Sequence, residues 1–114
     1  MHELAVCQDI IAQVESIAAR HEAKAVHSIQ LDIGPLSGVE APLLEAAFPI
    51  ASAGSVAENA ELKIEIAPIV VSCRSCHAKT TASANNLTCR ECGNWQTELI
   101  SGDEMILKRV ELDT

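Results

Sequence analysis

The N-terminal segment has the hydrophobic pattern of an amphipathic helix. Over residues 3–22, apolar side chains recur every three or four positions, and no Gly or Pro interrupts them. The main apolar stripe consists of Leu4, Cys7, Ile11, Val14 and Ala18. We therefore expect a helix whose other faces are exposed to solvent, with Cys7 buried as a small hydrophobic residue of the core.

Strict alternation of apolar and polar residues predicts strands further along the chain. Residues 27–33 and 62–66 alternate in this way, which is typical of half-buried strands. A last strand is expected over residues 104–112. There, Met105 and Leu107 share a face but Val110 is out of step, which indicates a β-bulge.

A second helix is expected over residues 41–52, after a turn or loop at residues 34–38. Pro42 is tolerated in the first turn of a helix, where its missing N–H has no partner in any case. Pro49 removes a donor in the helix interior, so we expect it to kink the helix or to end it early.

The order helix, strand, helix, strand, insertion, strand predicts an α+β fold, with two helices packed on a three-stranded sheet. The sheet and its helices are assigned to residues 1–69 and 98–114. The insertion, residues 70–97, is assigned to a second, zinc-ribbon-like domain that projects from the sheet.

Four cysteines in this insertion form two CxxC pairs, with twelve residues between the pairs. They are Cys73, Cys76, Cys89 and Cys92. Four thiolates in two chelating pairs make a closed tetrahedral zinc site, which has no open position and is therefore structural. Gly93 can take the positive φ that a tight metal knuckle requires.

Other readings of the cysteines are weaker. The same spacing would also hold iron in a rubredoxin-like site, and Cys73 to His77 spells a haem-attachment string. A second CxxC nearby, and the lack of an export signal, argue against haem. His77 is then either a solvated neighbour of the knuckle or a group that couples pH to metal binding. Trp95 is expected to cover the second knuckle.

Composition and charge exclude several classes of function. The 114 residues carry a net charge of −8, with one Phe, one Trp and no Tyr, so binding to nucleic acid or to an anionic membrane is disfavoured. No basic leader or membrane-spanning apolar run is visible, and we expect a cytoplasmic protein. No catalytic constellation and no phosphate loop occur, so we expect a protein that is not an enzyme.

The amino terminus is a second candidate metal site. The amine of Met1 and the amide and imidazole nitrogens of His2 can close fused chelate rings, with the Glu3 amide or a carboxylate as fourth donor. A nitrogen-rich square plane favours Ni(II) or Cu(II).

Five features occur together in order. They are Met1-His2-Glu3-Leu4, Ile33-Gly34-Pro35-Leu36-Ser37-Gly38-Val39-Glu40, the two CxxC knuckles, and Ser101-Gly102-Asp103-Glu104-Met105. In this combination the chain resembles the HypA/HybF family of nickel metallochaperones over nearly its full length.

The resemblance implies delivery of Ni(II) during maturation of [NiFe]-hydrogenase, and in some organisms of urease. It implies nickel at Met1, His2 and Glu3, with Glu40 as an auxiliary ligand, and zinc at the four cysteines. The implied partners are a HypB-type GTPase, the hydrogenase large subunit and urease maturation proteins. We expect the chain itself to be a monomer or a weak homodimer.

Two alternatives stay open at this point. CxxC pairs alone would also suit a zinc-ribbon module of the transcription machinery, or a small iron or redox carrier. Loss of Met1 and His2 would abolish nickel binding by a metallochaperone but would leave both alternative functions intact.

Overall fold

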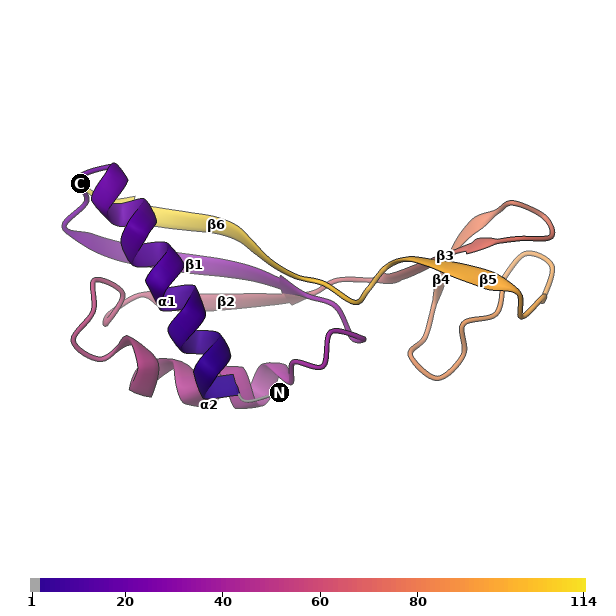
Figure 1. The fold of residues 1–114 in the computed structure, drawn as a ribbon, viewed down its shortest axis with the longest axis horizontal. Coiled ribbons are helices and arrows are strands. Elements are labelled where there is room, and N and C mark those ends of the chain that lie inside the picture. The colour runs from indigo at the N-terminus through magenta and orange to yellow at the C-terminus, as the bar shows by residue number, and fades with distance from the viewer. Residues whose placement is uncertain (1–2) are drawn as a thin grey trace.

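The structure is a computed structural model that describes residues 3–114. Its elements are α1 (Glu3–Arg20), β1 (Ala25–Ile33), α2 (Ala41–Ser52), β2 (Glu61–Ile66), β3 (Ile69–Cys73), β4 (Lys79–Ala82), β5 (Thr97–Ser101) and β6 (Met105–Asp113). They form two parts at opposite ends of a molecule 52 Å long (Figure 1). We call the part with both helices the body and the part with the cysteines the module.

The body is built around β1. This strand pairs with β2 in parallel and with β6 in antiparallel orientation, so that the sheet has the order β2-β1-β6. Parallel neighbours need a crossover connection, and α2 supplies it between β1 and β2. Ile29, Leu31 and Ile33 of β1 are fully buried in the core that the sheet forms with the helices.

The predicted fold class is confirmed: two helices pack on a three-stranded sheet, and a separate four-cysteine module is inserted before the last strand. The first helix ends at Arg20, two residues before the expected end. The predicted alternation of residues 27–33 corresponds to β1.

The expected early end of the second helix at Pro49 is wrong, because α2 continues through this residue to Ser52. The alternative expectation, a kink at Pro49, stays a prediction. Pro49 leaves the carbonyl of Glu45 without its usual N–H donor. Both residues lie on the exposed side of α2, where water can solvate that carbonyl. The helix therefore tolerates the proline.

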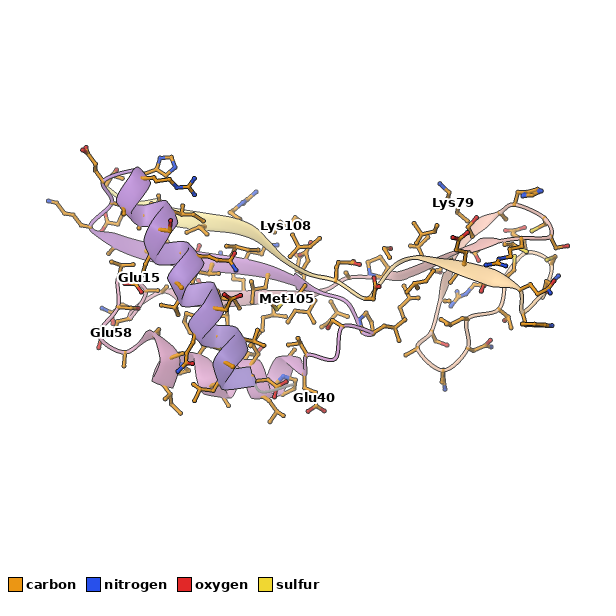
Figure 2. All side chains as sticks on the ribbon, viewed as in Figure 1. Glu15, Glu40, Glu58, Lys79, Met105 and Lys108 are labelled. Carbon is orange, nitrogen blue, oxygen red and sulfur yellow. The ribbon has the colours of Figure 1, made fainter. Side chains whose placement is uncertain are left out.

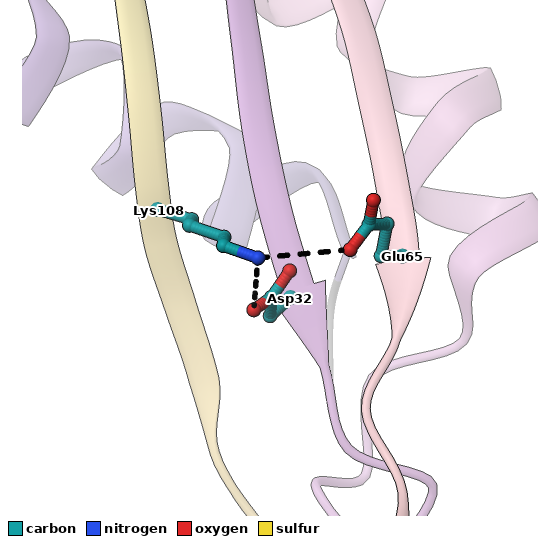
Figure 3. A network of polar contacts seen from close by, with 3 residues as sticks. All are labelled: Asp32, Glu65 and Lys108. Carbon is teal, nitrogen blue, oxygen red and sulfur yellow. Dashed lines mark ion pairs between the residues drawn. The ribbon is translucent and has the colours of Figure 1, made fainter.

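The predicted β-bulge in the last strand is confirmed. Gln30 pairs with Arg109 whereas Leu31 pairs with Leu107, so Lys108 is the extra residue of β6. Its Nζ lies 3.6 Å from Asp32 Oδ2 and 3.8 Å from Glu65 Oε2 on the face of the sheet away from the helices (Figure 3). The ion pairs link all three strands across the surface.

The module has a sheet of its own, with the order β4-β3-β5. In it β3 pairs with both neighbours in antiparallel orientation, and Val70 is opposite Ser101. On this pairing we propose to draw the boundaries of the module at residues 69 and 101. The predicted division at residues 70 and 97 stays a prediction.

The body and the module meet at a close backbone crossing of the 34–38 turn with the connection between β5 and β6. Leu36 N–H donates to Gly102 O over 2.7 Å, and Gly34 N–H donates to Glu104 O over 2.8 Å. The Gly102 N–H in turn donates to the Glu104 carboxylate, which lowers the pKa of that group. A Cβ on Gly34 would lie 2.2 Å from Gly102 O, so only glycine fits.

We predict that Gly34→Ala opens this crossing, because backbone atoms cannot move aside as a side chain can. The substitution should destabilise the protein by about 1–3 kcal/mol, the usual cost of overpacking, and should accelerate hydrogen exchange at the Leu36 amide. Gly54→Ala is the control, since Gly54 has a φ of 77° but open space around it. Unchanged protection of Leu36 in Gly34→Ala would contradict the prediction.

Candidate metal centre

The four cysteines of the module converge on one point. Their sulfur atoms all lie within 4.8 Å of one another, with Cys73 Sγ 3.5 Å from Cys92 Sγ and Cys76 Sγ 3.6 Å from Cys89 Sγ. A tetrahedral Zn²⁺ with bonds of about 2.3 Å requires sulfur atoms about 3.8 Å apart. The tetrad therefore fits a four-coordinate metal with no open position.

The two CxxC segments fold into matching turns. His77 N–H donates to Cys73 O over 3.0 Å, and Gly93 N–H donates to Cys89 O over 2.9 Å. Gly93 has a φ of 78°, which confirms the expected left-handed knuckle. His77 occupies the equivalent place with a φ of 64°. Alignment of the two knuckles by sequence would have revealed this strained histidine.

Backbone amides prepare one cysteine of each pair for metal binding. The amides of Cys76 and Ser75 donate to Cys73 Sγ, each over 3.4 Å, and lower the pKa of this thiol to about 6. The pKa of Cys89 is likewise lowered, chiefly by the amide of Cys92. Metals bind the thiolate, so these contacts favour ligation near neutral pH.

The module has little apolar core apart from the tetrad. Among the described residues of the module, the buried side chains other than cysteine are Ile69 and Val71. So few buried residues do not suffice to hold thirty or so residues together, and we therefore expect the module to depend on a metal bound by the tetrad.

Trp95 does not cover the second knuckle as expected, because 75% of its surface is exposed. A tight turn directs the chain here: Gln96 N–H donates to Asn94 Oδ1 over 2.8 Å, and Thr97 N–H donates to Trp95 O over 2.9 Å. The place of Trp95 in the sequence, three residues after Cys92, did not suffice to predict where its indole lies.

Two residues of the second candidate site, Glu3 and Glu40, lie where the two helices begin. Met1 and His2 are outside the described residues. Glu3 is the first residue of α1, and its Oε2 accepts a hydrogen bond of 3.4 Å from the backbone N–H of Glu40, the N-cap of α2. Figure 2 shows Glu40 at this end of α2. The structure thus brings together two predicted nickel residues that are 37 positions apart.

Cys7 lies at a contact between the two helices, one turn after Glu3 along α1. It is fully buried, as predicted, and its Sγ lies 3.5 Å from Leu44 O of α2. Burial, followed by the charge of Glu3, raises the pKa of this thiol. Cys7 is therefore an inert packing residue rather than a third kind of metal ligand.

Comparison with known proteins identifies the family. A family model described as "Hydrogenase/urease nickel incorporation, metallochaperone, hypA" matches residues 1–112. The chain belongs to the HypA family. Hydrogenase maturation factor HypA of Nitrosospira multiformis is 51% identical over 114 residues, covering 100% of this chain and 99% of the relative.

More distant relatives are also named hydrogenase maturation factor HypA or HybF. HypA of Aquifex aeolicus is 40% identical, with 99% of this chain and 98% of the relative covered, and HybF of Proteus vulgaris is 33% identical over 99% and 100%. The solution structure of the Ni metallochaperone HypA from Helicobacter pylori superposes with a TM-score of 0.72 at 26% identity, covering 99% of this chain and 98% of that one.

Family membership confirms the resemblance seen in the sequence, and with it a role in nickel incorporation for hydrogenase maturation. It also favours the metallochaperone over a nucleic-acid module or a redox carrier. None of the helices in residues 3–114 is long and apolar enough to cross a membrane.

We predict that His77→Gly gives a more stable module than His77→Ala by about 1 kcal/mol, because only glycine adopts a positive φ without strain. Gly93→Ala should have the opposite effect on the other knuckle. Thermal unfolding of the zinc-loaded proteins and zinc loss to a chelator would measure both. A His77→Gly protein that loses zinc faster than His77→Ala would refute this account and would give the imidazole a direct part in the site.

Proposed function

We propose that this chain carries Ni(II) at its amino terminus and releases it during maturation of a [NiFe]-hydrogenase. The ligands would be the amine of Met1, the amide and imidazole of His2 and the amide of Glu3, with Glu40 as an auxiliary carboxylate. The contact between Glu3 Oε2 and Glu40 N is the observation that carries the proposal. It supports a site in which the first residues of the chain lie beside Glu40.

The donor set suits nickel. The amine, amides and imidazole close short chelate rings along one stretch of chain, and Ni(II) accepts four such donors in a plane. A carboxylate from Glu40 would supply a further ligand or would hold one in place. No lysine or arginine lies within residues 25–62, so no basic side chain of this segment competes with Ni(II) for the carboxylate of Glu40.

The position of the site also suits release. Glu3 opens α1 and Glu40 caps α2, so the positive ends of two helix dipoles meet there. These dipoles disfavour a bound cation, while the carboxylates of Glu3 and Glu40 favour it. These opposing effects would suit a site that releases its ion, and protonation of the amine or imidazole would favour release further.

The tetrad of the module is proposed to hold Zn(II) as a structural ion. Four thiolates leave the metal no open position, so zinc would supply folding energy and no chemistry on a substrate. The rubredoxin-like alternative is excluded by metal analysis if zinc and no iron is found.

The partners proposed are a HypB-type GTPase and the hydrogenase large subunit, with urease maturation proteins as further candidates. The net charge of −8 suits a basic face on such a partner. We propose a cytoplasmic carrier that is not itself an enzyme and that exists as a monomer or a weak homodimer.

We predict that His2→Ala abolishes nickel binding and leaves one zinc per chain. Calorimetric titration of NiCl₂ into untagged protein, with an intact Met1 verified by mass, would measure this. His27→Ala is the matched control, because His27 is an exposed histidine on β1. Equal nickel binding by wild type and His2→Ala would overturn the amino-terminal site.

We predict that Glu40→Gln weakens nickel binding about tenfold, as expected for a group at the edge of a coordination sphere. Its backbone N–H still donates to Glu3, so the fold of this region is kept. Glu45→Gln is the control, since Glu45 lies further along α2 and is exposed. Identical affinities for the two variants would remove Glu40 from the site.

A further inference from the structure

Helix α2 is apolar on both of its sides. Its inner side contributes Leu44 and Phe48 to the hydrophobic core and also buries Ser52. Its exposed residues are Pro42, Leu43, Glu45, Ala46, Pro49 and Ile50. All but one of these exposed residues are apolar, whereas the outer side of a surface helix is normally charged or polar. A helix that is apolar all round is suited to burial on both sides.

The most exposed large side chains of this helix lie along one line. Leu43 is 50% exposed and Ile50 is 71% exposed, and they are seven positions apart, two turns of helix. Ala46 lies between them, and its small side chain permits close approach of another backbone. We call Leu43, Ala46 and Ile50 the outer face of α2.

The surroundings of the outer face are acidic. Glu40 and Glu45 flank it on α2, Glu3 contacts Glu40, and Glu58 follows the helix on an exposed loop. Figure 2 shows Glu40 and Glu58 near opposite ends of α2. The segment from residue 25 to residue 62 contains no Lys or Arg, so no basic group of that segment offsets these carboxylates.

A second copy of the chain is a poor occupant for this face. Two copies would each bring a net charge of −8, and both copies would bring the same acidic rim. A single helix of 12 residues is also short for a stable dimer, which usually buries about 800 Å² on each partner. Charge complementarity instead favours a basic occupant.

We propose that the outer face of α2 docks an amphipathic helix of a partner protein, with apolar residues against Leu43, Ala46 and Ile50 and with Lys or Arg beside Glu40 and Glu45. In helix-on-helix packing of this kind, the docked helix presents its anchor residues at spacings of three, four and seven positions. The docking surface itself does not depend on nickel. That the docked helix lies next to the nickel ligands rests on the proposed function.

The test uses a synthetic amphipathic helical peptide of leucine and lysine as the probe, and the same peptide with glutamate in place of lysine as its counterpart. Titration would be followed by calorimetry and by NMR shifts of the full chain. We expect the lysine peptide to bind and to shift α2 resonances, and the glutamate peptide not to bind. Leu43→Ser with Ile50→Ser should weaken binding at least about tenfold, as loss of central anchors does.

Ile100→Ser is the matched control, because Ile100 is also 50% exposed but lies on β5 in the module. It should bind the peptide as wild type does. Equal loss in the control, or no loss in the α2 double variant, would reduce the binding to unspecific charge attraction and overturn the proposal. A wild-type dimer that the double variant converts to monomer would overturn it in favour of a second copy.

Nickel titration separates this proposal from the proposed function. The double variant should keep wild-type nickel affinity, because Leu43 and Ile50 offer no ligand. His2→Ala should keep wild-type affinity for the peptide. Loss of peptide binding in His2→Ala would contradict the docking surface, whereas loss of nickel alone would leave it intact.

Discussion

Burial of β1 between two strands and under two helices is the constraint on which the body depends. Ile29, Leu31 and Ile33 are almost completely removed from water, and each such side chain contributes about 1.5–3 kcal/mol to folding. Because β1 is the central strand, both β2 and β6 pair with it, and their registers are set by that pairing. The end of β1 also sets where the 34–38 turn runs, and therefore where Glu40 and α2 begin.

The two candidate metal sites differ in how they are built. The cysteine tetrad is made of two matching turns whose amides already point at sulfur, within a part that has few other buried residues. The proposed amino-terminal site would instead take its position from the body, through the contact of Glu3 with Glu40 and of Cys7 with Leu44. The first arrangement suits permanent retention of an ion, and the proposed second one would suit exchange.

Periodicity predicted the parts of this fold that are governed by burial. The alternation of residues 27–33 and the misfit of Val110 indicated a strand and a bulge, and both are present. An early helix end at Pro49 and a knuckle covered by Trp95 were predicted wrongly, because a residue's type does not reveal whether a freed carbonyl or an indole faces water. The meeting of Glu3 and Glu40 was implied by the family resemblance alone, since hydrophobic patterning carries no information about contacts between helix ends.

The pairing of β3 with β5 places the entry and the exit of the module side by side, with Val70 opposite Ser101. The chain therefore leaves the body and returns to it at nearly one point, as it would in a hairpin. A cassette attached in this way can be lengthened, shortened or exchanged during evolution without altering the register of β1 with β6. The architecture thus lets the metal-stapled end of the molecule diversify while the helical end stays the same.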